Sequence, residues 1–128
     1  MSFTFLEKKM VGRTGTGNFI TVSVHKRGKD NKGNEKYSLV IYFSREACKE
    51  FRILGGQRYL IGFDEKLLAL KPSVDGYVIT ASSKQSTRIQ FGINGMPSWI
   101  NKDTRISLSK KDCMVDEGMI ILDTSRKD

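Results

Sequence analysis

Five basic side chains lie within eleven residues, at positions 26–36, beside only two acidic ones. Lys and Arg neutralise the phosphates of a nucleic acid and release its counterions, which gives affinity whatever the base sequence. The segment is rich in Gly, Asn and Asp, as the tip of a long β-hairpin would be. A solvated loop that only keeps the protein soluble explains this composition equally well. The candidate phosphate-binding residues are Lys26, Arg27, Lys29, Lys32 and Lys36.

Aromatic rings offer a second kind of chemistry, because unpaired bases stack on exposed rings beside a basic groove. The candidates for such stacking are Tyr42, Tyr59 and Trp99. Trp99 is the strongest of the three, since it stands beside Pro97 in a stretch that we expect to be irregular. Most aromatic side chains of a small domain belong to the core, so core packing is the competing interpretation for each.

Catalytic and metal-binding groups are sparse. The single histidine, His25, has no obvious carboxylate partner, and Cys48 and Cys113 have no Cys or His at metal-ligand spacing. The acidic pairs at 64–65 and 116–117 fall in predicted turns, where charges are usually solvated. The sequence therefore predicts a protein that is not an enzyme and uses no cofactor, with Cys48 an inert thiol.

Length and charge set the wider frame. The 128 residues suit one domain, and a net charge of +8 with a pI near 9.6 favours a polyanionic partner. Residues 1–64 hold 12 basic and 6 acidic side chains, a balance of +6, whereas residues 65–128 hold 10 and 8, a balance of +2. We therefore expect the partner to meet the N-terminal half. The chain has neither an apolar run of membrane length nor a signal-peptide core, which predicts a cytoplasmic protein without a membrane partner.

Hydrophobic periodicity predicts the elements that position these residues. Residues 3–6 and 19–25 are expected to be strands on either side of the glycine-rich segment 12–17, and residues 37–43, apolar on both faces, a central strand. Ser44 should cap a short helix whose apolar stripe ends at Leu54, with Gly55 and Gly56 closing it. A hairpin should join residues 58–63 and 67–71, and further strands are expected at 76–81 and 88–92.

The order strand, short helix, hairpin at 37–72 returns loosely at 87–124. There, residues 96–100 stand in the place of the helix, and residues 104–108 with 119–122 in the place of the hairpin. The predicted fold is mainly β (α+β): a small β-barrel or curved antiparallel sheet with one or two short helices, built by internal duplication. Within one domain of 128 residues, residues 1–36 would form the N-terminal strands and basic hairpin, 37–124 the two units, and 125–128 a frayed tail.

Residues 39–72 resemble the swapped-hairpin unit of AbrB-type transition-state regulators and MazE-type antitoxins, with a degenerate second copy at 87–124. The resemblance is carried by the segments 39–47, 53–59 and 67–72. It implies a barrel that binds DNA through basic residues on strands and loops, and a homodimer unless the second copy completes the barrel within one chain. By position, it assigns the DNA contacts to Arg45, Lys49 and Arg58.

Together these features predict a small nucleic-acid-binding protein, with DNA favoured over RNA, whose basic hairpin contacts the phosphate backbone. It could serve as a regulator of transcription or as a single-strand-binding protein. The alternative is an interaction module or inhibitor that uses the same hairpin to bind an acidic protein surface.

Overall fold

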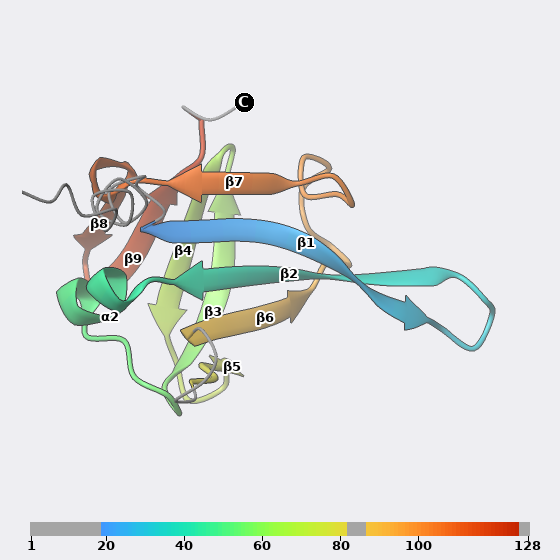
Figure 1. Cartoon of the computed structure of the whole chain (residues 1–128), viewed down its shortest axis with the longest axis horizontal. Coiled ribbons are helices and arrows are strands. Elements are labelled where there is room, and N and C mark those ends of the chain that lie inside the picture. The colour runs from blue at the N-terminus through green and yellow to red at the C-terminus, as the bar shows by residue number, and fades with distance from the viewer. Residues whose placement is uncertain (1–18, 82–86, 126–128) are drawn as a thin grey trace, which may run out of the picture.

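The computed structural model describes residues 19–81 and 87–125, which fold into two antiparallel β-sheets and one short α-helix (Figure 1). The first sheet has the strand order β6-β2-β1-β7, and the second has the order β5-β3-β4-β9-β8. The prediction of a mainly β fold built from antiparallel strands is confirmed. The first-sheet strands are β1 (Ile20–Lys29), β2 (Glu35–Phe43), β6 (Thr87–Gly92) and β7 (Arg105–Leu108). The second-sheet strands are β3 (Arg58–Asp64), β4 (Leu67–Pro72), β5 (Tyr77–Val78), β8 (Cys113–Asp116) and β9 (Met119–Asp123).

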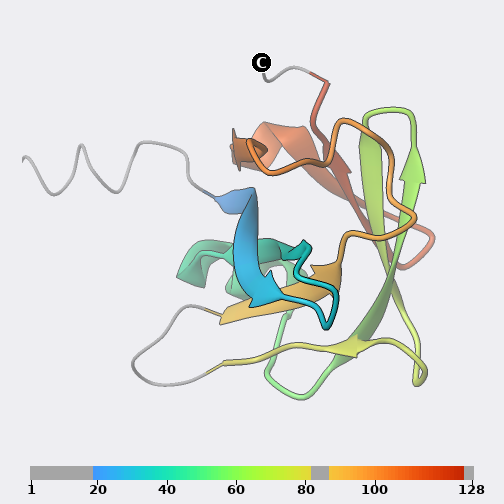
Figure 2. The same cartoon turned by 90° about the vertical axis from the view of Figure 1, so that its right-hand side faces the viewer.

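The two sheets face each other across one hydrophobic core (Figure 2). Successive residues of a strand point to opposite faces, so alternate apolar positions of β1, β2 and β6 enter this core together. The second sheet supplies Leu68 and Leu70 from β4 and Leu122 from β9, all fully buried. β2 lies between β1 and β6, which confirms the predicted central strand at 37–43. The core residues of the first sheet are Ile20, Val22, Val24, Leu39, Ile41, Phe43, Ile89, Phe91 and Leu108.

The helix α2 (Arg45–Phe51) follows β2 directly. Ser44 caps it as expected, because its hydroxyl oxygen accepts a hydrogen bond of 3.0 Å from the amide of Ala47. The predicted end of the helix was wrong. Arg52, with φ 56°, takes the left-handed position and its amide closes on the carbonyl of Cys48, so the helix ends before Gly55 and Gly56. Leu54 therefore leaves the apolar stripe and is 66% exposed.

The predicted hairpin in the middle of the chain is confirmed as β3 and β4, which pair from Tyr59 with Pro72 to Asp64 with Leu67. The strand expected at 76–81 is shorter, because only β5 joins the edge of β3. Past its end, Thr80 pairs with Arg88 at the start of β6 through two backbone hydrogen bonds of 2.8 and 2.9 Å. This bridge connects the two sheets on one side, and the described residues do not close into a barrel.

The second half of the chain does not reproduce the strand, helix and hairpin of the first. Residues 96–100 form turns in place of the expected helix, and a single 3-10 turn, η1 (Lys110–Asp112), precedes β8. β7 and β9 do not form a hairpin: β7 pairs with β1 in the first sheet, and β9 pairs with β4 and β8 in the second. Pairing between strands that are distant in the sequence therefore determines the fold of this half, although its elements follow a similar order along the chain.

Three sequence predictions lie outside the described residues: the strand at 3–6, the glycine-rich segment 12–17 and most of the tail at 125–128. In the part of the chain that the structure does describe, no helix combines the length and apolar character needed to cross a membrane.

Candidate nucleic-acid interface

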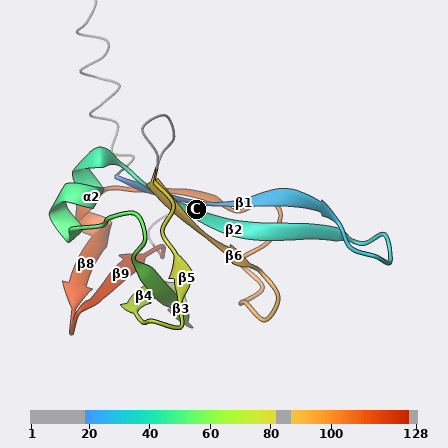
Figure 3. The same cartoon turned by 90° about the horizontal axis from the view of Figure 1, so that it is seen from below.

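The hairpin between β1 and β2 projects beyond the rest of the first sheet (Figures 1 and 3). β1 and β2 stay paired as far as Lys29 and Glu35, but β7 pairs with β1 only over its first four residues, 20–23. On the other side, β6 reaches no further along β2 than Ser38. Residues 26–36 thus form a two-stranded ribbon that no other strand of the described residues joins, and we call this segment the basic ribbon.

Asp30 holds the tip of the basic ribbon in one shape. Its Oδ1 accepts hydrogen bonds of 2.9 Å from the amides of both Lys32 and Asn34, and the Asp30 amide donates to the carbonyl of Asn34 at 2.8 Å. Gly33 supplies the positive φ, 84°, that the turn needs. These bonds, above all that from Asn34, lower the pKa of the Asp30 carboxyl. The one acidic side chain at the tip is therefore part of the turn.

The other acidic side chain of the basic ribbon is paired. The ammonium of Lys26 lies 2.5 Å from Oε2 of Glu35, and this hydrogen bond raises the pKa of Lys26 and lowers that of Glu35. The hydroxyl of Tyr37 also donates to Glu35, at 3.2 Å. Lys26 is thus partly neutralised where it stands. The three remaining lysines, Lys29, Lys32 and Lys36, are exposed and form no ion pair with any described residue.

Arg27 belongs to the sheet surface more than to the tip. It continues the outward alternation of residues 21, 23 and 25, and a β-bulge between Lys26 and Gly28 leaves it without a cross-strand partner. With the Gln90 amide oriented so that its oxygen faces Arg27, that oxygen accepts from Nε and Nη2, both at 3.0 Å. The amide of Gln90 also lies 3.4 Å from the hydroxyl of Ser38. Gln90 on β6 therefore orients the guanidinium of Arg27 across β2.

We call the side of the first sheet that faces away from the core its outer face. Cross-strand pairing aligns Arg88 of β6, Tyr42 of β2, Thr21 of β1 and Ser107 of β7 in one row. The ring of Tyr42, which is half-buried, meets the ring of His25 edge to face, with centroids 6.1 Å apart.

A second row on this face places Gln90, Val40, Ser23 and Arg105 side by side. His25 lies over Ser23, with 2.9 Å between its Nε2 and the serine hydroxyl. Sequence reasoning did not select Arg88, Gln90 or Arg105 as site residues. The alternation of Ile89 and Phe91 with polar residues was the available signal, because it places residues 88 and 90 on the face opposite the core.

The residues assigned by resemblance do not gather at this surface. Arg45 and Lys49 are exposed on α2, which lies at the end of the first sheet opposite to the basic ribbon (Figure 1). Arg58 is on β3 in the second sheet, where its Nη1 donates to the carbonyl of Gly76 at 3.1 Å. This hydrogen bond stabilises the turn before β5. Arg45, Lys49 and Arg58 therefore do not form one site with the basic ribbon.

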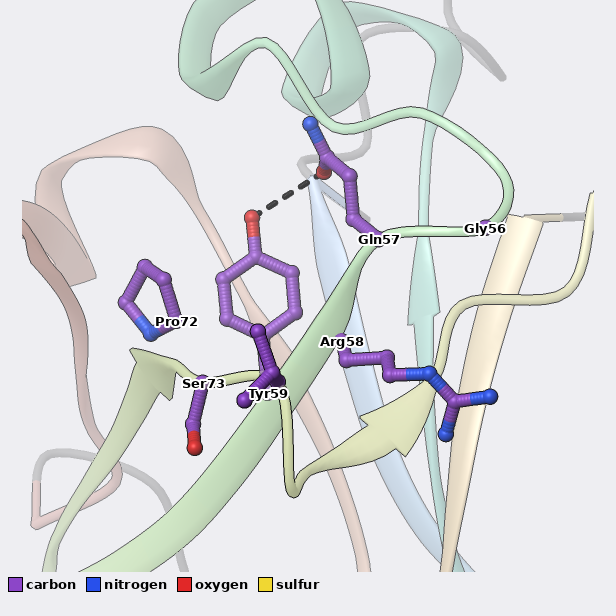
Figure 4. Close-up of a pocket in the computed structure, with 7 residues that line it drawn as sticks. Gly56, Gln57, Arg58, Tyr59, Pro72 and Ser73 are labelled. Atoms are coloured by element: carbon purple, nitrogen blue, oxygen red, sulfur yellow. Dashed lines mark hydrogen bonds between the residues drawn. The ribbon is translucent and has the colours of Figure 1, made fainter.

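Two of the three candidate stacking residues are committed to other contacts. Tyr59 is only 6% exposed, and its hydroxyl donates to Oε1 of Gln57 at 3.1 Å (Figure 4), so its ring belongs to the core. The indole of Trp99 donates to the carbonyl of Glu65 at 3.1 Å and packs edge to face on Phe63. The ammonium of Lys66 lies 5.1 Å from the centroid of the Trp99 ring. Of the three, Tyr42 alone stands on the outer face, near the end of β2 that leads into α2.

No family model matches the sequence, and neither the curated proteins nor the solved structures contain a significant match to it.

Proposed function

We propose that this protein binds nucleic acid, with DNA favoured over RNA, and that Lys29, Lys32 and Lys36 of the basic ribbon contact its phosphates. The observation that supports this proposal is the disposition of charge on the ribbon. Both acidic side chains of the segment are used within it, Asp30 by the turn and Glu35 by Lys26. Three exposed ammonium groups remain on a projection that a long anionic backbone can approach from several sides.

Charge reversal on the ribbon tests this proposal. The variant K29E/K32E/K36E removes three phosphate contacts, so its affinity for an oligonucleotide should fall by about tenfold or more. The slope of log affinity against log salt should become shallower by about two to three, because each lost contact no longer releases a counterion. Fluorescence anisotropy with labelled DNA and RNA, at two or more salt concentrations, measures both quantities.

The matched control is K71E/K110E/K111E, which changes the net charge by the same amount at exposed positions on β4 and η1. A specific role for the ribbon requires this control to keep most of the native affinity and salt slope. An equal loss in both triple variants would mean that only total charge matters. No binding of the native protein to any oligonucleotide at low salt would reject the proposal, and an acidic protein surface would then become the expected partner.

A further inference from the structure

We infer that the nucleic acid is single-stranded where it meets the protein, and that the outer face of the first sheet holds its unpaired bases, with Tyr42 as the stacking platform. This inference rests on the proposed function, in which the basic ribbon contacts the phosphates. It adds a second surface, built from β1, β2, β6 and β7, and a class of ligand.

The position of Tyr42 follows from strand alternation. Leu39, Ile41 and Phe43 of β2 are buried in the core, so Tyr42 points to the opposite side. The second sheet lies entirely on the core side of β1, β2 and β6 (Figure 3). In the described part of the chain, the one ring that Tyr42 contacts is that of His25, and a single edge-to-face contact occupies at most one face of the tyrosine ring.

Such a ring distinguishes between single and double strands. In a duplex the faces of the bases are covered by their neighbours in the stack, so they cannot lie on a protein side chain. Unpaired bases can, and proteins that bind single strands combine aromatic side chains on a sheet with a basic groove. A half-buried tyrosine on an inner strand of the sheet can therefore stack on an unpaired base but not on a base inside a duplex.

The groups around Tyr42 suit a nucleotide. Arg88 is the cross-strand neighbour of Tyr42 on β6, and Arg105 lies two strands away in the next row, so the outer face itself carries two cations. Gln90 orients Arg27, and the hydroxyls of Ser23 and Ser38, which are both buried, contact His25 and Gln90. Because these side chains already contact one another, binding a strand orders few further side chains.

The outer face is continuous with the basic ribbon. Lys36 follows the same alternation on β2 as Ser38, Val40 and Tyr42, and it therefore lies on the outer-face side of the ribbon. A single strand of nucleic acid whose phosphates contact Lys36 and the neighbouring lysines can thus run along β2 to the ring of Tyr42. It does not have to cross an edge of the sheet.

The corresponding face of the second sheet has a different character. Its outward positions are mainly apolar or small, as in the pairs of Gly62 with Ala69 and of Ala69 with Ile121, and Met114 beside them is 57% exposed. Apart from Arg58, Lys71 is the one basic residue at the outward positions of β3, β4, β8 and β9, and Asp64, Asp116 and Asp123 are the acidic ones. We therefore expect the nucleic acid at the outer face of the first sheet because of the side chains there. The backbone does not distinguish the two faces, since both sheets are antiparallel.

Replacing Tyr42 tests the inference. Affinity for a single-stranded oligothymidylate should fall about 5- to 100-fold in Y42A, the range for loss of one base stacked on an aromatic ring. The salt slope should stay native, because no phosphate contact is removed. Y42W should keep most of the affinity, since any aromatic ring presents a face to a base. Y77A is the matched control: Tyr77 is 49% exposed on β5, outside the outer face. Circular dichroism and urea unfolding show that each variant is folded.

The outcomes separate this inference from the proposed function. Native protein should bind the single strand more tightly than the same sequence in a duplex, and Y42A should reduce this preference. If K29E/K32E/K36E loses affinity while Y42A binds the single strand as the native protein does, the phosphate-binding function stands and the stacking surface is rejected. Equal or tighter native binding to the duplex also rejects it. Comparing the affinities of a ribose and a deoxyribose oligomer shows which backbone the protein prefers. Y42A should weaken the binding of both.

Discussion

Gly76 lies directly against the backbone of Tyr59, so closely that a Cβ at position 76 would stand 2.3 Å from the Tyr59 carbonyl carbon and 2.6 Å from its nitrogen. Backbone atoms cannot move aside as a flexible side chain can. G76A should therefore separate β5 from β3 and lower the free energy of unfolding by about 2 to 4 kcal/mol. Urea denaturation followed by circular dichroism measures this change.

The matched control is G62A, in the same strand as Tyr59, where a Cβ would meet nothing within 4 Å. That variant should stay within about 0.5 kcal/mol of the native protein. If G76A were as stable as G62A, the close approach of Gly76 to Tyr59 would not exist in solution.

The turn of the basic ribbon should loosen in acid. Hydrogen bonds lower the pKa of Asp30 below its ordinary value of 3.8, and pairing with Lys26 lowers that of Glu35 below 4.5. The folded ribbon thus favours the ionised carboxylates, and this contribution is complete above those ordinary values and is lost as the pH falls through the lowered ones.

NMR titration of amide shifts from pH 6 to pH 2 tests this prediction. The amides of Lys32 and Asn34, which donate to Asp30, should shift, while that of Ile41 in the core should change little. In D30A the Lys32 and Asn34 shifts should already be displaced at pH 6. A large change in the amide shift of Ile41, together with the shifts of the turn, would instead indicate global acid unfolding.

Gln90 should act through Arg27. Because the Gln90 oxygen accepts from two nitrogens of the guanidinium, Q90L frees Arg27 without changing its charge. We expect affinity for a single strand to fall about 2- to 10-fold, the effect of losing one charged hydrogen-bonded contact. R27K keeps the charge but lacks the planar fork, so it should match Q90L in an anisotropy titration. Native affinity in R27K would show that the orientation of Arg27 has no role in binding.

Cys113 should resist alkylation in the folded protein. Burial, with a smaller effect of the neighbouring Asp112 carboxylate, raises the pKa of its thiol to about 12. At pH 8 only about one molecule in ten thousand then carries the reactive thiolate. In C48S, where Cys113 is the remaining cysteine, iodoacetamide should label the native protein far more slowly than the urea-unfolded one, as read by mass spectrometry. Similar labelling rates in both states would contradict the buried environment.

The sequence predicts best those features that depend on local pattern. Apolar residues on both faces correctly indicate β2 as a central strand, and two apolar runs separated by a short turn indicate the hairpin of β3 and β4. The hydroxyl of Ser44 identifies the start of α2. The end of α2 was missed because Arg52 adopts the conformation expected of the glycines three residues later. A basic residue with positive φ gives no signal in the sequence.

The candidate site shows the same division. The basic ribbon follows from composition, but the hydrogen bonds of Asp30 and the ion pair of Glu35 with Lys26 depend on how the hairpin folds. Arg88 and Arg105 share the outer face with Tyr42 only because β6 and β7 join the sheet on opposite sides of the β1 and β2 pair. These pairings connect residues more than 40 positions apart, and no local pattern specifies them. For the same reason, similar order along the chain at 87–124 did not produce a similar unit.

The basic ribbon contributes no residue to the hydrophobic core, and its pairing ends outside the reach of β6 and β7. Substitutions at its exposed positions should therefore alter the proposed binding of nucleic acid with little effect on folding. Natural selection or a protein engineer can vary charge, length and sequence at this projection while the remainder of the domain serves as an unchanging scaffold. The architecture thereby assigns evolvability and stability to different parts of one small chain.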